Sequence, residues 1–257
     1  MVNSNSKVNF IIAGTQKGGT TALDFYLRQH PGIAMASKKE VHFFDRDDRY
    51  QRWRNIAYYH KHFNFSNKEK IVGEATPSYM YSSDAIERIY QYNPEIKLIA
   101  VLRNPIDRAF SHWNMTRLNK FEPLSFSQAI TKEQVRCRRH LPGICQRYSY
   151  IDRGFYTEQI RRMRRYFDDT QLLFIRHESL KQNPAETLHR VTEFLQVSPF
   201  PAIQPKDIHS KPYDTKMSEV ERARLNELYY YEIKQLERML NWDCSAWLTT
   251  TPQQKTV

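Results

Sequence analysis

The chain has 257 residues, of which 40% are hydrophobic and 13% aromatic, and this composition excludes a disordered protein. A chain of this length can bury a core without disulfides or metals, so we expect one domain over residues 1–257, with its core at about residues 8–248. Lys and Arg outnumber Asp and Glu by 39 to 28, and the formal charge of +11 favours polyanionic partners or substrates.

Five short apolar segments are typical of buried strands, and they comprise residues 8–14, 32–37, 70–75, 97–104 and 171–179. Amphipathic patterns predict helices at residues 20–30, 84–92, 105–119, 125–140, 154–168, 183–197 and 217–240. Strands that alternate with helices predict an α/β fold of three layers, in which a central parallel sheet has helices on both faces.

A glycine-rich loop, Gly14–Thr21, follows the first strand and opens the first helix. Backbone N–H groups and the helix dipole hold anions at such a place. The spacing imitates a Walker A loop, but Thr20 stands where that loop has its lysine, and the lysine comes earlier, at Lys17. The fourth strand leads into Arg103, where a nucleotide triphosphatase often has a magnesium-binding aspartate. We therefore predict a P-loop-like phosphate-binding loop that does not serve an ATPase, and a plain glycine turn is the alternative.

Four segments in chain order carry a family resemblance: GTQKGGTTALDFYLRQHP from Gly14, KKEVHFFD from Lys38, VGEATPSYMY from Val72 and LRNPIDRAFSHW from Leu102. With them the chain resembles the sulfotransferases that use 3′-phosphoadenosine-5′-phosphosulfate (PAPS). The nearest branch is that of the heparan-sulfate-type enzymes and their bacterial relatives. The resemblance implies PAPS as the donor, adenosine 3′,5′-bisphosphate as the product, and no metal.

The same resemblance implies a donor site built from separate parts of the sequence. The residues around the 5′-phosphosulfate are those of the loop: Lys17, Gly18, Gly19, Thr20 and Thr21. Arg103 and Ser111 hold the 3′-phosphate, and an ordinary small helix residue is the alternative for Ser111. Lys211 matches a lysine of a late cofactor loop, although Pro212 follows it where the family has glycine.

Sulfuryl transfer requires that the acceptor lose a proton and that the departing phosphate oxygen be stabilised. Lys17 supplies a positive charge beside that oxygen. By resemblance, Glu40 is the general base. His42 lies two residues on, hence on the same side of an extended segment, and orients Glu40 or is itself the base. Asp45 joins the same group, and a buried histidine without catalytic work is the alternative for His42.

One departure from the family concerns the third motif. Enzymes of the heparan-sulfate branch carry a lysine within Glu-Lys-Thr-Pro, whereas this chain has alanine at that place, Ala75. An alanine supplies no charge, so any substrate or catalytic role of that lysine is absent or moved, which weakens a carry-over of the specificity of that branch.

These observations predict a sulfotransferase that moves the sulfuryl group of PAPS to a hydroxyl or amine of a carbohydrate, lipid or natural product, with anionic saccharides among the acceptors. A small-molecule kinase of the P-loop type is one alternative, but it would need a lysine at position 20 and magnesium ligands. A non-catalytic, basic polyanion-binding protein is the other, and it leaves the four motifs unexplained. We expect no nucleic-acid partner.

The cellular location is predicted from the absence of targeting, membrane-spanning and disulfide signals in the sequence. The first apolar stretch is too short for a signal peptide, and no segment approaches ~20 continuous apolar residues. The three cysteines, Cys137, Cys145 and Cys244, form no CxxC pair, which indicates neither a disulfide framework nor a zinc site. We expect no membrane span and a reducing, cytoplasmic location.

Overall fold

The structure is a computed structural model that describes residues 7–52, 56–66, 70–141, 143–201 and 213–248. Contacts divide the chain into two compact units. Unit 1 combines Met1–Arg103 with Ile160–Ser210, and unit 2 combines Asn104–Gln159 with Lys211–Val257. This division does not test whether the chain is one domain, and the single domain over residues 1–257 stays a prediction.

Unit 1 is built on a parallel sheet of five strands with the order β2-β3-β1-β4-β5. The strands are β1 (Phe10–Gly14), β2 (Ile33–Met35), β3 (Ile71–Ala75), β4 (Lys97–Leu102) and β5 (Leu172–Arg176). All five predicted strands are confirmed, but the last one ends at Arg176, and residues 177–179 of that predicted segment begin a short helix that was not predicted. Every residue of β1 is buried, because the strand has a neighbour on each side and helices over both faces.

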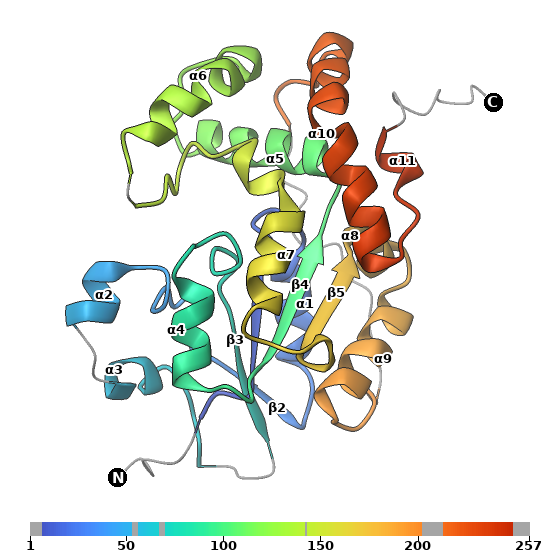
Figure 1. Ribbon diagram of the computed structural model, residues 1–257. Coiled ribbons are helices and arrows are strands. Elements are labelled where there is room, and N and C mark those ends of the chain that lie inside the picture. Colours follow the sequence, from blue (N-terminus) through green and yellow to red (C-terminus); the bar gives the residue numbers. More distant parts are fainter. Residues whose placement is uncertain (1–6, 53–55, 67–69, 142, 202–212, 249–257) are drawn as a thin grey trace. The chain divides into compact units, whose positions relative to one another are not determined.

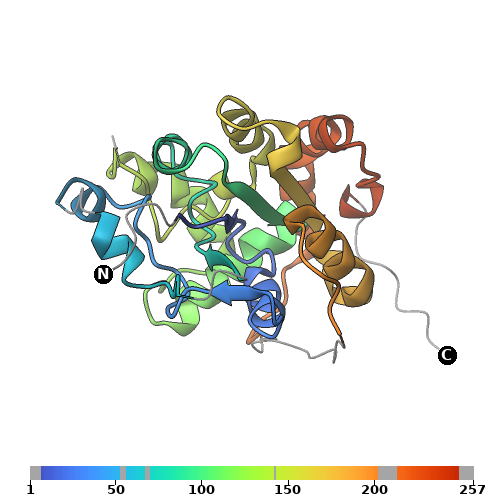
Figure 2. The same ribbon diagram turned by 90° about the horizontal axis from the view of Figure 1, so that it is seen from below.

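Helices cover both faces of this sheet, as Figures 1 and 2 show. One face packs against α1 (Thr20–Leu27), α8 (His177–Gln182) and α9 (Pro184–Leu195), whose buried side chains share one apolar cluster with those of β1 and β4. The opposite face is covered by α4 (Ala85–Tyr92), which buries Ile86 and Ile89. The predicted three-layer α/β arrangement is therefore confirmed. Two short helices between β2 and β3, α2 (Asp47–Arg52) and α3 (Ile56–His60), were not predicted.

The path of the chain creates a point where the strand order reverses. The chain runs from β1 through α1 to β2 and β3 on one side, and α4 then crosses to β4 and β5 on the other side of β1. In open parallel sheets, ligands bind outside the carboxyl ends of the strands at such a switch point. The end of β1 and the end of β4 flank it here.

Unit 2 is helical in its described residues and contains α5 (Pro105–Leu118), α6 (Phe126–Arg138), η1 (Asp152–Gly154), α10 (Glu219–Leu240) and α11 (Ser245–Leu248). Its helices begin where the sequence offers caps: the Asn104 side chain accepts from the N–H of Ile106, and Ser125 and Ser218 form capping boxes. The helix α7 (Tyr156–Arg164) spans the division between the units, and η2 (Asp169–Gln171) lies in unit 1.

Candidate functional site

The glycine-rich loop lies tightly against the end of β4. The backbone N–H and the hydroxyl of Thr15 both donate to the carbonyl oxygen of Val101, at 3.0 and 2.8 Å. A Cβ at Gly18 would lie 2.2 Å from that same oxygen. Gly19, the residue before α1, has a φ of 107°, and a Cβ there would lie 2.9 Å from the Nδ1 atom of His177. Both glycines are therefore required by the path of the loop.

The N-terminal end of α1 has the donors that an anion needs. The first N–H groups of a helix have no acceptor within the helix. Gly19 provides no side-chain cap, and the first turn of α1 carries no acidic residue. Lys17 lies half-buried in the same loop, with a φ of 68°. Backbone N–H groups, the helix dipole and an ammonium group together fit a phosphate or phosphosulfate.

The predicted residues of the 3′-phosphate site fall in different parts of the structure. Arg103 follows β4 directly, two residues beyond Val101, and so lies at the same edge of the sheet as the loop. Ser111 is buried on α5 in unit 2. Lys211 lies outside the described residues. The structure thus brings Arg103 to the edge that carries the loop, and the pairing of Arg103 with Ser111 stays a prediction.

The segment that carries Glu40 is tied to the same edge through β3. The N–H of Glu40 donates to the carbonyl oxygen of Ala75, the last residue of β3, at 2.9 Å. The N–H of Met80, further along the chain from β3, donates to the carbonyl oxygen of Ala13 in β1 at 2.9 Å. The predicted base and the predicted phosphate loop therefore follow neighbouring parts of one sheet edge.

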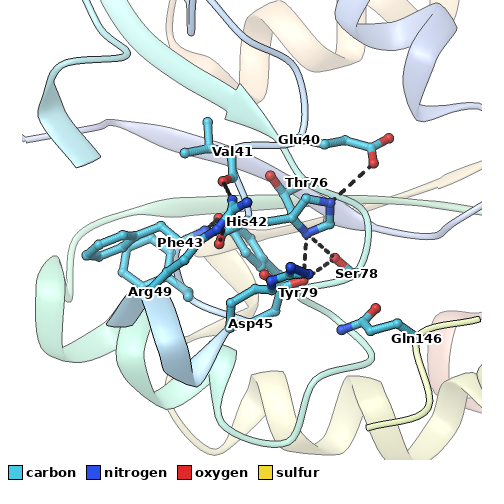
Figure 3. A network of polar contacts seen from close by, with 12 residues as sticks. Glu40, Val41, His42, Phe43, Asp45, Arg49, Thr76, Ser78, Tyr79 and Gln146 are labelled. Carbon is cyan, nitrogen blue, oxygen red and sulfur yellow. Dashed lines mark hydrogen bonds and ion pairs between the residues drawn. The ribbon is translucent and has the colours of Figure 1, made fainter. Parts of the chain in front are cut away.

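Glu40, His42 and Asp45 form one chain of polar contacts, drawn in Figure 3. The Nε2 atom of His42 lies 3.4 Å from Oε2 of Glu40, and its Nδ1 atom lies 2.8 Å from Oδ2 of Asp45. The hydroxyl of Ser78 donates to the same Asp45 oxygen and lies 3.3 Å from the imidazole Nδ1. Both imidazole nitrogens thus face a carboxylate. Ser78 was missed by the sequence reasoning, although it stands in the VGEATPSYMY segment.

The geometry behind this contact differs from the expectation. The segment is not extended, because Glu40 and His42 have left-handed backbone conformations, with φ of 61° and 54°. Such values are rare for residues other than glycine and persist only where surrounding contacts hold them. Glu40 and His42 do meet, but through this unusual backbone rather than through the alternation of an extended strand.

The charges of this group are strongly coupled. The hydrogen bond from His42, with Lys39 also nearby, outweighs burial and lowers the pKa of Glu40 to about 2. Burial alone would lower the pKa of His42, but hydrogen bonds to Asp45 and Glu40 raise it to about 9. Burial likewise opposes the charge of Asp45, yet the hydrogen bond to His42 keeps the pKa of Asp45 below its ordinary value. Near neutral pH the group is an imidazolium between two carboxylates.

A second hydrogen-bond network, centred on the buried Glu74, contacts the segment that carries Glu40 and His42. Glu74 in β3 is fully buried and accepts hydrogen bonds from Tyr59 at 2.7 Å, Thr76 at 2.6 Å and Tyr79 at 3.2 Å. The Tyr79 hydroxyl in turn accepts from the backbone N–H of Phe43 at 3.0 Å. Burial raises the pKa of Glu74 to about 7. This network fixes the backbone next to His42, and Glu74 was not identified from the sequence.

The described residues lack two features, a cluster of metal-ligating side chains and a membrane-spanning helix. Residues 7–52, 56–66, 70–141, 143–201 and 213–248 contain no group of three His, Cys, Asp or Glu side chains placed to hold a metal ion. In the same ranges, no helix combines the length and the apolar character that crossing a membrane requires. The expectations of a metal-independent reaction and of a cytoplasmic location stay predictions.

Comparison with known proteins gives a family match over most of the chain. The family model of the sulfotransferase domain matches residues 7–237. The chain is 32% identical to heparan sulfate glucosamine 3-O-sulfotransferase 5 of Mus musculus over 192 residues, which are 74% of this chain and 53% of that protein. It is 36% identical to heparan sulfate glucosamine 3-O-sulfotransferase 6 of Homo sapiens over 185 residues, 72% of this chain and 51% of that protein.

Among solved structures, a sulfotransferase from Alicyclobacillus acidocaldarius is similar over nearly the whole chain. The TM-score is 0.83 at 30% sequence identity, and the match covers 95% of this chain and 100% of that chain. The chain spans about half the length of the curated relatives named above. The membrane-associated sulfotransferase kil1 of Dictyostelium discoideum is 39% identical over 127 residues, 46% of this chain and 26% of that protein.

Proposed function

The chain belongs to the sulfotransferase domain family, and on that basis we propose that it transfers the sulfuryl group of PAPS to a hydroxyl or amine of an acceptor. Adenosine 3′,5′-bisphosphate is the second product. The observation that carries the proposal is the arrangement of unit 1. A phosphate-type loop and Arg103 flank the switch point of the sheet, and Glu40 with His42 stands at the same edge.

In the proposed site the loop binds the donor. The N–H groups at the start of α1 and the ammonium of Lys17 contact the 5′-phosphosulfate, from the residues Lys17, Gly18, Gly19, Thr20 and Thr21. Arg103 binds the 3′-phosphate through charge-assisted hydrogen bonds, and we assign Ser111 and Lys211 supporting contacts to the donor. Gly19, the residue before α1, makes no side-chain capping hydrogen bond at this helix end, which supports the assignment.

The transfer step follows from the chemistry of the donor. The acceptor oxygen or nitrogen attacks sulfur, and the bond between sulfur and the bridging oxygen of the 5′-phosphate breaks. Glu40 takes the acceptor proton, and Lys17 stabilises the negative charge on the departing oxygen. His42, held by Asp45, orients the Glu40 carboxylate. Because His42 is protonated near neutral pH, the structure supports Glu40 rather than His42 as the base.

For the acceptor, we infer a saccharide, and an anionic one is favoured. Two of the three curated relatives named above are, by their names, heparan sulfate glucosamine 3-O-sulfotransferases. The net charge of +11 is consistent with an anionic acceptor. Ala75 supplies no charge at the end of β3, so we do not extend the proposal to heparan sulfate itself.

The proposal is tested first on the donor. Adenosine 3′,5′-bisphosphate at 100 times its dissociation constant should stabilise the protein by about 2.7 kcal/mol, which a thermal melt detects, whereas ATP with magnesium should stabilise it weakly. Radiolabelled PAPS is then offered with a panel of saccharides, lipids and phenols, with and without chelator. Stabilisation by ATP with magnesium, but not by adenosine 3′,5′-bisphosphate, would indicate a kinase. Salt-dependent binding of DNA without any nucleotide effect would indicate a polyanion-binding protein.

A further inference from the structure

Both oxygens of the Glu40 carboxylate have a cationic partner. The Nζ atom of Lys39 lies 2.7 Å from Oε1, and Nε2 of His42 lies 3.4 Å from Oε2. The side chain of Glu40 is 44% exposed, so the carboxylate still faces solvent. A general base must be basic enough to take the proton of the acceptor. Because a cation at each oxygen stabilises the ionised carboxylate and makes it a weaker base, Glu40 stands in a resting arrangement that is poorly suited to that step.

The two cations are not held equally. His42 is anchored from its other side by Asp45, whose side chain is fully buried and also accepts from Ser78. Lys39 has a side chain with four rotatable bonds that is 22% exposed, and its ammonium contacts Glu40 and no other polar side chain of the described residues. Lys39 is therefore the partner that can leave Glu40 without breaking a buried network, whereas His42 cannot.

Further positive charge lies beside this segment. The Nη1 atom of Arg49 donates to the carbonyl oxygens of Val41 at 2.5 Å and of His42 at 3.3 Å. Lys38 directly precedes Lys39 in the chain. These cations attract an anionic group of the acceptor, which can then bind the Lys39 ammonium in place of Glu40.

We propose that Lys39 is a positioning residue that holds Glu40 in an unreactive ion pair until an anionic group of the acceptor draws the ammonium away. The inference rests on the proposed function and goes beyond it, because it states how the site limits the hydrolysis of PAPS when no acceptor is bound. In that side reaction a water oxygen attacks sulfur, the bond between sulfur and the bridging phosphate oxygen breaks, and the water proton passes to Glu40. The products are sulfate and adenosine 3′,5′-bisphosphate. Lys39 suppresses this reaction by keeping the carboxylate occupied.

The test measures hydrolysis of saturating, radiolabelled PAPS without any acceptor. Lys39→Met removes the ammonium but keeps the length of the side chain, and we expect acceptor-free hydrolysis to rise about 10-fold, a part of the 10²–10⁴-fold that a general base contributes. Lys39→Arg restores the charge and should stay within about twofold of wild type. Lys7→Met removes an exposed lysine before β1, at the opposite end of the strands from the site, and should also match wild type.

A second arm tests the anion. Methanesulfonate has no hydroxyl or amine to sulfate, so it can draw Lys39 away without becoming a product. At constant ionic strength and saturating PAPS, it should raise hydrolysis by the wild type several-fold and leave Lys39→Met unchanged. Thermal melting and bisphosphate affinity, both expected to match wild type, show that Lys39→Met is folded. If Lys39→Met is not folded, Lys39→Gln, which keeps a polar side chain, takes its place.

The outcomes separate two failures. If Lys39→Met binds the bisphosphate normally but hydrolyses PAPS no faster than wild type, or if methanesulfonate does not activate the wild type, the role of Lys39 is wrong. A wild type that neither binds the bisphosphate nor turns over PAPS with any acceptor would instead overturn the proposed function. A merely structural role for Lys39 predicts slower hydrolysis in Lys39→Met, which is the opposite of the expected result.

Discussion

Replacing His42 with glutamine should change how the stability of the protein depends on pH. In the folded protein the pKa of His42 rises from its ordinary value of 6.5 to about 9, because hydrogen bonds to Asp45 and Glu40 outweigh the effect of burial. A raised pKa means that the folded state binds the proton more tightly than the unfolded state. The stabilisation is therefore fully present below pH 6.5 and is lost as the pH rises through about 9.

The size of this contribution follows from the two values. A rise from 6.5 to about 9 corresponds to about 3 kcal/mol at 1.36 kcal/mol for each pH unit. The side chain of His42 is 29% exposed, and screening by solvent brings the expected contribution to about 2 kcal/mol. His42→Gln also leaves the buried carboxylate of Asp45 without its cation, so the variant should be less stable than wild type throughout the neutral range.

The assay is urea unfolding of wild type and His42→Gln between pH 5.5 and pH 9.5. We expect the difference in unfolding free energy to be largest at or below pH 6.5 and to shrink by about 2 kcal/mol towards pH 9.5. The matched control is His189→Gln, since His189 is an exposed histidine of the same unit and its replacement should change the unfolding free energy by less than about 0.5 kcal/mol. A difference for His42→Gln that stays constant with pH would show that His42 is not held as an imidazolium, and His42 would then be eligible as the base.

Three further predictions concern the donor, the base and the loop. Glu40→Gln should lower turnover by about 10²–10⁴-fold while bisphosphate affinity, measured by calorimetry, stays near wild type; an active Glu40→Gln beside an inactive His42→Ala would transfer the role of base to His42. Arg103→Ala should weaken the binding of the bisphosphate by about 1.5–3 kcal/mol and the binding of adenosine 5′-phosphosulfate much less, because only the bisphosphate carries a 3′-phosphate. Equal losses of affinity for the two ligands would contradict this role of Arg103. Gly18→Ala should cost about 1–3 kcal/mol in urea unfolding, because its Cβ would lie 2.2 Å from a carbonyl oxygen of β4. The Cβ of Gly32→Ala would meet only two ring atoms of His30, at 3.3 and 3.4 Å, and the variant should cost less than about 1 kcal/mol; similar costs for the two variants would refute the close fit of the loop.

The sequence alone predicted the sheet, most of the helices and the position of the glycine-rich loop between β1 and α1. These features depend on local patterns: runs of apolar residues, proline at a helix start, and glycines between a strand and a helix. The two short helices between β2 and β3 were missed because neither is long enough to show the 3.6-residue period clearly. The parallel direction of the strands was also predictable from the sequence, since alternating strands and helices leave few other arrangements.

The candidate site was predicted as a set of residues but not as a geometry. The sequence motifs identified Lys17, Glu40, His42 and Arg103 as site residues. Glu40 and His42, however, meet through left-handed backbone conformations that no local sequence pattern predicts. These conformations depend on contacts with Ala75 of β3 and with Tyr79, which are distant in sequence from Glu40 and His42.

Tertiary structure alone decided the electrostatics. The cationic partners of Glu40, the buried carboxylate of Asp45 with its Ser78 donor, and the pKa of about 7 at Glu74 depend on burial and on distances between side chains. A sequence gives the charges of these groups but not the separations that set their interaction energies, and those energies change steeply over a few ångströms when water is excluded.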